Sequence, residues 1–474
     1  MLIKILIISL YAIMIAVLGV IGFRKTHTFL DYFLGSRRVG PWMTAFTYGA
    51  AYFSAVLFIG FAGKIGWDFG LSGLWIAAGN VIFGVLLVWW LLGPRIRRMS
   101  IEYDVHTIAE FFEKRYNSPF LKIFTSTAIF VFFIPYSAAV FIGLSYLFNA
   151  NFNIDYVHAL IFMGFFTAFY LVLGGYKSMT MVDVFFGMIM CAGVIVLFVS
   201  TLKTGGGLDK INSGLASIEP ALTSWVGPPG WWPLFCLVFL TSIAPFAMPQ
   251  LVQKFYAIRD ERAIKIGMAA STIFAVLVVG TAYFTGATTR IFLNPETTPK
   301  AFSQGKPVFD AIMPEFIARV IPSSLSIVIM LLILAASMST LAALVLVSSS
   351  SIAKDLYAGF INKEVTDQKL TLLMRVLSGL FVFISVLLAY FKPATIVFIL
   401  GISWGVIGSS FLGPFIWGLF SRHVNKIGAI VSALLGLATC ILLTILKMPS
   451  PQSGTIGMIV SLVSCPIFSL IKRT

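Results

Sequence analysis

Runs of about 20 apolar residues recur from one end of this chain to the other, and they constrain its fold more than any other feature. A helix of that length crosses the roughly 30 Å hydrocarbon core of a bilayer and satisfies its own backbone hydrogen bonds there. Only 11% of the 474 residues are charged, whereas a typical soluble domain has about 25%. Because so few charges cannot cover the apolar runs in water, we predict an all-α integral membrane protein.

We expect about thirteen transmembrane helices. The predicted segments are 2–22, 41–70, 72–93, 119–149, 156–176, 178–202, 231–255, 264–290, 322–350, 368–390, 393–420, 425–447 and 454–471. We interpret the first as a retained helix rather than a cleaved signal peptide, because no small-residue cleavage site follows it before Arg24 and Lys25.

The net charge of +15 would suggest nucleic-acid binding in a soluble protein. Here the Lys and Arg residues are concentrated in loops that follow odd-numbered segments, and this group includes Arg97, Lys177 and Lys254. By the positive-inside rule those loops lie in the cytoplasm, so we place the N-terminus outside and the C-terminus inside. We expect a multi-pass protein of a bacterial inner membrane that contacts the lipid bilayer, with no nucleic acid and no obligatory protein partner.

The four cysteines and four histidines form no site that the sequence reveals. The cysteines lie in or beside apolar segments without metal-binding or redox spacing, and the histidines are dispersed. We therefore predict no catalytic residues and no enzyme activity. A membrane-embedded enzyme and an ion channel are kept as remote alternatives.

Asp183 is the one carboxylate well inside an apolar segment. Such residues are costly in a membrane and are functional candidates for that reason. It lies within about five residues of the predicted helix start, so it could also reach the interface or pair with Lys177. A coupling or gating role and plain anchoring are equally good interpretations.

Two predicted segments contain residues that interrupt a helix. Segment 41–70 has small residues around Tyr48 to Ala55, and segment 231–255 has Pro245 and Pro249, each of which removes a backbone donor. A kink without a ligand explains either one alone. Each segment, however, opens a set of five helices, which is the inverted-repeat pattern expected of a secondary transporter.

The predicted ninth helix contains a run that can bind a cation. Ala336, Ser339 and Thr340 are spaced i, i+3 and i+4, so they share one helix face. Two hydroxyls and a carbonyl there, with carbonyls from unwound backbone at Ala50 to Phe53, provide the oxygen ligands that small hard cations prefer. The alternative is that the hydroxyls bond back to the preceding turn of their own helix.

Four stretches carry a resemblance to the sodium:solute symporter family. The resemblance extends in order along nearly the whole chain. The four stretches are Tyr32 to Pro41, Gly174-Gly175 leading to Asp183, Ala335 to Thr340 with Lys354-Asp355-Leu356-Tyr357, and Gly405 to Pro414. Within the family the chain is most similar to sodium/proline symporters. The resemblance implies secondary active transport: symport of sodium and a small organic solute into the cell by alternating access.

The resemblance implies a LeuT-like inverted repeat of five plus five helices. The expected parts are 1–40, an extra transmembrane helix and cytoplasmic linker; 41–203, the first repeat; 204–230, an extracellular loop; 231–420, the second repeat; and 421–474, two C-terminal helices. The family's sodium site maps onto Ala50, Phe53, Ala336, Ser339 and Thr340. Serines that form a further sodium site in some members are Ala342 and Ala343 here, so one sodium ion is expected.

The solute site maps less completely. Tyr136 and Pro249 match pocket residues of the proline symporters, and Ser54 and Thr241 are weaker candidates. Aromatic positions of the family pocket are Thr241 and Pro245 here, and an acidic position is Tyr52. An amino acid such as proline is the first expectation for the solute, and a monocarboxylate, a vitamin and a sugar are the alternatives that the family implies.

Overall fold

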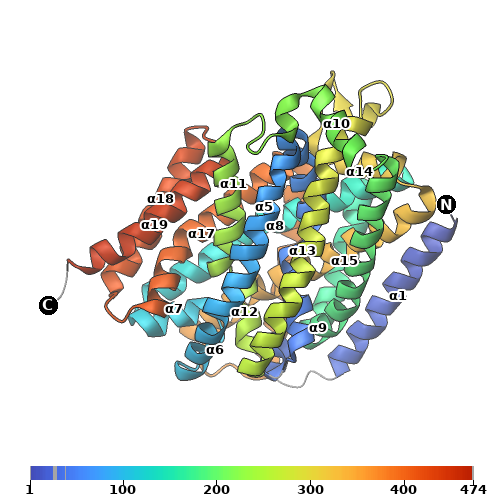
Figure 1. The fold of residues 1–474 in the computed structure, drawn as a ribbon. Helices are drawn as coiled ribbons and strands as arrows, with labels where there is room; N and C mark the ends of the chain where they lie inside the picture. Colours follow the sequence, from blue (N-terminus) through green and yellow to red (C-terminus); the bar gives the residue numbers. More distant parts are fainter. Residues whose placement is uncertain (1, 25–28, 38, 472–474) are drawn as a thin grey trace.

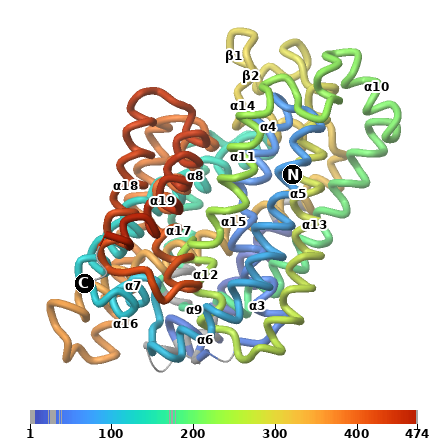
Figure 2. Tube along the Cα trace, turned by 60° about the vertical axis from the view of Figure 1, so that its left-hand side comes forward, coloured from blue at the N-terminus to red at the C-terminus, as the bar shows by residue number. Residues whose placement is uncertain are grey.

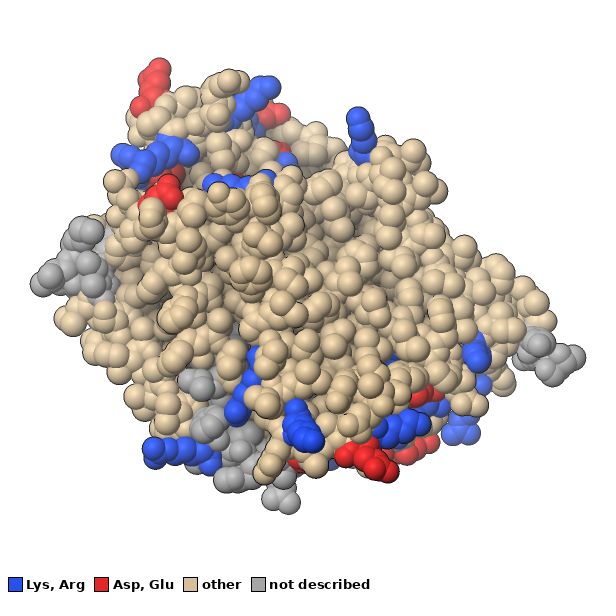
Figure 3. Space-filling view, turned by 180° about the vertical axis from the view of Figure 1, so that it is seen from behind, with Lys and Arg blue, Asp and Glu red and all other residues tan. Residues whose placement is uncertain are grey.

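The computed structural model describes residues 2–24, 29–37 and 39–471. Within these residues the chain forms long, closely packed helices, and its strands are the short hairpin β1 (Phe302–Ser303) and β2 (Lys306–Pro307) (Figure 1). Figure 3 shows Lys, Arg, Asp and Glu gathered at two opposite ends of the molecule, with a broad uncharged belt between them. Such a belt matches the apolar layer of a bilayer.

Nine helices in the described part of the chain are long and apolar enough to cross a membrane, and a bent pair of helices makes a tenth. Two shorter apolar helices, Leu6–Ile21 and Tyr156–Phe169, coincide with the first and fifth predicted segments. The prediction of an all-α membrane protein is thus confirmed.

The first half of the chain contains α1 (Leu2–Arg24), α2 (Phe29–Leu34), α3 (Pro41–Tyr52), η2 (Val56–Phe61), α4 (Ala62–Phe69), α5 (Leu74–Gly79), η4 (Asn80–Leu92), α6 (Gly93–Glu102), α7 (Ile108–Tyr116), α8 (Pro119–Phe152), α9 (Tyr156–Thr204) and α10 (Leu208–Ile218). The second half contains α11 (Trp231–Ile243), η6 (Ala244–Ala247), α12 (Pro249–Ala257), α13 (Glu261–Phe292), α14 (Phe309–Arg319), α15 (Ser323–Ser350), η8 (Ser351–Ile361), α16 (Asp367–Phe391), α17 (Ile396–Phe420), α18 (Lys426–Ile445) and α19 (Ser450–Ser469). Short 3-10 turns at 35–37, 70–73, 220–223 and 299–301 complete the described elements.

The fifth and sixth predicted segments both lie in α9, which consists of two helices that meet at a kink at Gly175. This glycine has a φ of +64°, and a Cβ there would lie 2.6 Å from the ring of Tyr32. Glycine is therefore required both by the left-handed backbone and by the close approach of α2. The predicted boundary at residue 177 lies two residues beyond the observed bend.

Both predicted interruptions are present. Helix α3 ends at Tyr52, the backbone is extended at Phe53, and helical structure resumes in η2. Helix α11 gives way to the 3-10 turn η6 at Pro245, and α12 starts at Pro249 after a bend of 42°. The two breaks meet, because the Tyr52 hydroxyl donates to the carbonyl of Thr241.

Helices α17, α18 and α19 pack against one another along one flank of the molecule, coloured orange to red in Figure 2. Opposite ends of the bundle are named here for the short helices that cover them. The α7 end contains α6 and α7, and the α14 end contains α10, α14 and the β-hairpin (Figure 1).

Candidate functional site: a broken helix beside an aromatic cavity

The end of α3 and the middle of α15 form a cluster of oxygen atoms. The Thr340 hydroxyl oxygen lies 2.9 Å from the carbonyl oxygen of Ala50, 3.4 Å from that of Ala51 and 3.1 Å from that of Ala336. All four residues are buried. The predicted partners Ala50, Ala336 and Thr340 are thus in contact, and Ala51 is an oxygen donor that the sequence did not single out.

This cluster has three carbonyl acceptors but only one hydroxyl hydrogen to donate to them. A hydroxyl carries one hydrogen, so Thr340 can donate to only one of the three carbonyls at a time. The carbonyls of Ala50 and Ala51 also lie at the C-terminal end of α3, where the helix dipole is negative. Oxygen-rich geometry at a negative helix end suits a small hard cation.

Phe53 and Ser339, the other two predicted sodium residues, lie beside this cluster. Phe53 has an extended backbone, and its N–H donates to the carbonyl of Gly49 at 2.9 Å. The Ser339 hydroxyl is fully buried and has no hydrogen-bond partner among the described residues. An unused hydroxyl beside the carbonyl cluster is available to a ligand.

Asp183 and Lys254 form a buried charge pair next to Ser339. Both side chains are fully buried and their charges interact, and the Ser339 hydroxyl lies beside the Asp183 carboxylate. The ammonium of Lys254 lies 5.1 Å from the ring centroid of Tyr176. The side chain of Lys177, the predicted partner of Asp183, lies outside the described residues.

The placement of Lys254 in a cytoplasmic loop was wrong. Helix α12 continues to Ala257, three residues beyond Lys254, and packs against α3 and α6. The sequence analysis counted Lys254 among the loop residues because it stands at the very end of the predicted segment 231–255. The tertiary structure buries it because Asp183 supplies a compensating charge across the bundle.

Ser337 is a residue that sequence reasoning passed over. Its hydroxyl accepts a hydrogen bond from the N–H of Ala55 at 3.2 Å, so α15 satisfies a backbone donor that the break in the first helix exposes. The run Ala335 to Thr340 therefore contacts both sides of this break. Ser337 supports the start of η2, and Thr340 contacts the end of α3.

A small aromatic cavity of about 30 Å³ lies beside the two broken helices. Its lining residues are Tyr52, Phe53, Ser54, Val56, Leu57, Phe61, Asn80, Tyr136, Thr241, Tyr283, Leu400 and Trp404. Tyr52 stacks on Trp404 with ring centroids 5.9 Å apart, and Tyr136 meets Trp404 edge-on at the same distance. Ser54, Tyr136 and Thr241, three of the four predicted solute residues, line this cavity.

Asn80 is the polar residue of this cavity that the sequence analysis missed. Its side-chain oxygen accepts hydrogen bonds from Thr241 at 2.8 Å and Ser242 at 3.0 Å, which ties η4 to α11. An amide inside the long apolar run 72–93 was a usable signal, since polar groups in membrane helices face the protein interior.

Pro249 lies elsewhere. It lines a small cavity of about 10 Å³ toward the α7 end, together with Gln253, Tyr256 and Asp355. The proline begins α12, and the bend of the chain directs it away from the aromatic cavity. The structure therefore does not place Pro249 with the other three solute candidates.

The α7 end is closed by a polar network. Thr107 caps α7 by accepting from the N–H of Glu110 at 3.0 Å, and it donates to Asp355 at 2.8 Å. Glu110 also pairs with Lys354 at 2.9 Å. Burial raises the pKa of Glu110, but Lys354 and His106 outweigh it, so the pKa lies below its usual value. The network ties α7 to η8.

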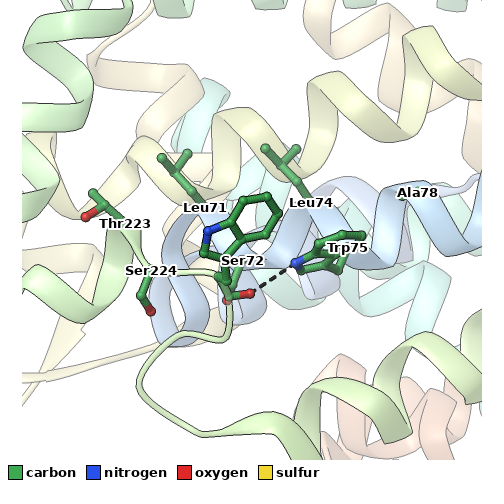
Figure 4. Close-up of a pocket in the computed structure, with 8 residues that line it drawn as sticks. Leu71, Ser72, Leu74, Trp75, Ala78, Thr223 and Ser224 are labelled. Carbon is green, nitrogen blue, oxygen red and sulfur yellow. Dashed lines mark hydrogen bonds between the residues drawn. The ribbon is translucent and has the colours of Figure 1, made fainter.

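A further hollow lies at the surface near the start of α5. It is lined by Leu71, Trp75, Thr223 and their neighbours, and the indole of Trp75 donates to the carbonyl of Trp225 at 3.0 Å (Figure 4). Trp225 is 78% exposed. Exposed tryptophans near the ends of membrane helices are typical of a membrane interface.

Comparison with known proteins gives a consistent result. The model of the sodium:solute symporter family matches residues 32–436. The osmoregulated proline transporter OpuE of Bacillus subtilis is 28% identical over 98% of this chain and 94% of its own length. The high-affinity proline transporter PutP of the same organism is 29% identical over 90% of this chain and 89% of its own. A sodium/proline symporter of Staphylococcus aureus is 27% identical over 89% of this chain and 82% of its own.

Solved structures show the same fold. A Na⁺-coupled sialic acid symporter in a substrate-bound outward-open state has a TM-score of 0.84 at 18% identity, over 99% of this chain and 98% of its own. The transporter MhsT in complex with L-phenylalanine has a TM-score of 0.50 at 14% identity, over 90% of this chain and 97% of its own. The LeuT-like fold expected from the sequence is thus confirmed.

Proposed function

Because this chain belongs to the sodium:solute symporter family, we propose that it uses a sodium gradient to take up a small zwitterionic amino acid such as proline. The observation that carries this proposal is the position of the Thr340 oxygen cluster at the broken end of α3, directly before residues that line the aromatic cavity. The proline transporters among its relatives support the choice of solute.

We assign the sodium to Ala50, Phe53, Ala336, Ser339 and Thr340, and we expect one ion. A sodium ion that bridges α3 and α15 would fix the backbone at residues 50–53. Tyr52, Phe53 and the next residue, Ser54, line the cavity. Solute bound there would in turn hold the same backbone. Each ligand therefore raises the affinity of the other by the same factor, which is the thermodynamic requirement for coupling.

Solute contacts are assigned to Ser54, Tyr136 and Thr241, with Asn80 and Trp404 added from the structure. No ionised side chain lines this cavity in the described part of the chain. A zwitterion would be held by hydroxyl and amide groups and by the ends of the broken helices, whose dipoles attract opposite charges. The aromatic rings would enclose its apolar part.

Asp183 is assigned a gating role through Lys254. Its carboxylate lies near Ser339, so its charge reaches the sodium site, and Lys254 on α12 balances that charge. Movement of α12 relative to α9 would change this balance when the α7 end opens. We place that end in the cytoplasm, with the N-terminus outside, the C-terminus inside, and residues 41–203 and 231–420 as the two repeats.

Uptake into proteoliposomes tests the proposal. Radiolabelled proline, other amino acids, carboxylates and sugars are supplied with and without an inward sodium gradient. We expect saturable accumulation of proline or a similar amino acid only with the gradient. Accumulation of a sugar or carboxylate instead would overturn the solute assignment, and equal accumulation without sodium would overturn the coupling.

A further inference from the structure

The cavity of Pro249, Gln253 and Asp355 at the α7 end, called here the inner cavity, is very small. Its volume of about 10 Å³ is that of a single water-sized particle, so no organic solute fits inside it. Gln253 lines it from α12, and Asp355 lines it from η8. The inner cavity therefore has room for one water molecule or one dehydrated ion between two elements of the bundle.

Asp355 and Gln253 each contribute a buried oxygen that has no hydrogen-bond partner among the described residues. Asp355 accepts from Thr107 at 2.8 Å through one carboxylate oxygen, and its other oxygen is the unpartnered one. The amide nitrogen of Gln253 donates to the carbonyl of Phe33 at 3.1 Å, which fixes the side chain and leaves its amide oxygen unpartnered. The two side chains are 0% and 2% exposed. Buried oxygens of this kind are normally satisfied by water or by an ion.

The charges around Asp355 favour an ion over water. Among the described residues, Glu110, Lys354 and Lys122 are the charged groups that act on its carboxylate. Lys354 is paired with Glu110 at 2.9 Å, and Lys122 is paired with Glu113 at 2.7 Å. Each of these cations is thus matched by another carboxylate, and the charge of Asp355 is left over. Because a buried charge without compensation is costly, a bound cation stabilises this arrangement.

The oxygens around the inner cavity suit sodium. Ser350 and Ser351 also line it, and each hydroxyl donates its hydrogen to a carbonyl of its own helix, at 2.8 Å. Their lone pairs are therefore directed away from that bond and can face a cation. A carboxylate oxygen, an amide oxygen and hydroxyl oxygens are the ligands that small hard cations prefer. The small volume favours sodium over the larger potassium ion.

The inner cavity lies on the same helix face as the Thr340 cluster. Helix α15 continues without a break from Thr340 to Ser350, and η8 follows directly at Ser351. Thr340 and Ser351 are therefore about three helical turns apart, a rise of about 16 Å along one face. On the proposed topology the α7 end is cytoplasmic. An ion that leaves the Thr340 cluster along this face toward the cytoplasm reaches the inner cavity next.

We propose that Asp355 and Gln253 form an inner sodium site, which receives the ion released from the Thr340 cluster before it enters the cytoplasm. The proposal rests on the proposed sodium symport. The same ion occupies the two sites in turn, so the inner site is compatible with the transport of one sodium ion per cycle. The carboxylate of Asp355 compensates the charge of the ion after it has left the carbonyls of α3.

The first test measures protection of Asp355 by sodium, with dicyclohexylcarbodiimide as the probe, because this reagent modifies buried protonated carboxyl groups. Modification of the purified wild-type protein is followed by mass spectrometry in sodium, potassium or choline chloride. We expect sodium to slow the modification of Asp355 several-fold, in the wild type and in Thr340→Ala, and potassium to have little effect. Asp310, a buried carboxyl at the α14 end, is the internal control and should react equally in all three salts.

Equal modification of Asp355 in sodium and in choline would overturn the inner site and leave water as its occupant. Equal protection by sodium and potassium would overturn the assignment to sodium. Because the wild-type protein provides this readout, the result does not depend on how any variant folds.

The second test examines Gln253 as a ligand. Gln253→Leu removes its amide oxygen, so we expect the sodium concentration for half-maximal protection of Asp355 to rise about three-fold to ten-fold. Gln250→Leu is the matched control, because it removes a fully buried amide from the same helix that does not line the inner cavity. An unchanged half-protecting concentration in Gln253→Leu would contradict a site made by the two residues.

The third test examines sodium release, with proline as the solute in proteoliposomes. Net uptake requires sodium to leave toward the cytoplasm, whereas exchange of proline with saturating sodium on both sides does not. Asp355→Asn keeps an acceptor for Thr107 but removes the charge, so we expect several-fold slower net uptake and unchanged exchange. Wild-type net uptake, or an equal loss of uptake and exchange, would overturn the release role. If the wild type accumulates no amino acid in a sodium gradient, the proposed function has failed, and the protection of Asp355 still decides the inner site.

Discussion

At the scale of single residues, the proposed sodium site depends most on the contacts of Thr340. Its hydroxyl is surrounded by three carbonyls, two of which belong to another element. The alternative interpretation, that such hydroxyls bond only to the preceding turn of their own helix, describes Ser385 and Thr289 well. It describes Thr340 only in part, because the contact to Ala50 is the shortest of the three.

Thr340→Ala should raise the sodium concentration for half-maximal uptake at least ten-fold. Removal of one oxygen ligand from a cation costs about 1.5–3 kcal/mol, and 1.4 kcal/mol is a factor of ten. The measurement is sodium-dependent uptake, with membrane protein quantified in parallel. Thr289→Ala, which removes a buried hydroxyl that bonds only within α13, is the control. An unchanged sodium dependence of Thr340→Ala would disprove the site.

Lys254→Met should destabilise the protein far more than the double change with Asp183→Asn. The single change leaves a buried carboxylate without its compensating charge, which typically costs about 3–5 kcal/mol, whereas the double change removes both charges. Thermal unfolding in detergent and the amount of protein in the membrane are the readouts. If both variants lose the same stability, the two charges are not energetically coupled.

At the scale of elements, the breaks in α3–η2 and α11–α12 are held by side chains from other helices. Ser337 of α15 satisfies the N–H of Ala55, and Asn80 of η4 bonds to Thr241 and Ser242 beside the second break. Broken helices are tolerated in a membrane only where protein groups replace the lost backbone bonds. The α14 end has a similar device, because Asp310 accepts from the N–H of Ile396 at 3.1 Å and caps α17.

The burial of the Asp310 carboxyl predicts a pH dependence of stability. Burial raises the pKa of Asp310 to about 6, against opposition from the Ile396 N–H and from Lys64. The pKa of Asp310 in the folded protein lies above the usual 3.8, so the folded state favours the protonated carboxyl. The stability that this preference contributes is full below about pH 4 and is lost as the pH rises through 6.

We therefore expect the wild type to lose up to about 3 kcal/mol of this contribution between pH 4 and pH 7.5. Asp310→Asn keeps an acceptor for the Ile396 N–H but does not titrate, so its melting temperature should depend less on pH. Thermal unfolding at several pH values provides the comparison. Identical pH profiles for the two proteins would show that Asp310 does not control this range.

At the scale of the whole molecule, three cavities follow one another from the α14 end to the α7 end. The first, of about 300 Å³, is lined by residues of α4, α11 and the N-terminal ends of α17 and α19. The aromatic cavity comes next, and the cavity of Pro249, Gln253 and Asp355 lies beneath the α7 network. Thr107 and Asp355 close that end, since their hydrogen bond joins α7 to η8. Alternating access would require this contact to open.

Asp355→Ala should shift the molecule toward the form that is open at the α7 end, whereas Asp355→Asn should not, because the amide oxygen still accepts from Thr107. The readout is the labelling rate of a cysteine placed at Gln253, which is buried in that cavity. We expect labelling to increase several-fold with Asp355→Ala only. Equal labelling in the two variants would show that the Thr107–Asp355 hydrogen bond does not keep the α7 end closed.

The sequence by itself determined the membrane class, the helix segments and the two breaks, because apolar run length and proline or small-residue interruptions are local properties. It also identified Ala336, Ser339 and Thr340 as one helix face, since helical spacing is local too. Only the tertiary structure brought Thr340 to Ala50, 290 positions away in the chain, paired Lys254 with Asp183, and separated Pro249 from Tyr136. Those relations depend on how distant helices pack, and a buried charge or carbonyl is recognised only when its partner across the bundle is known.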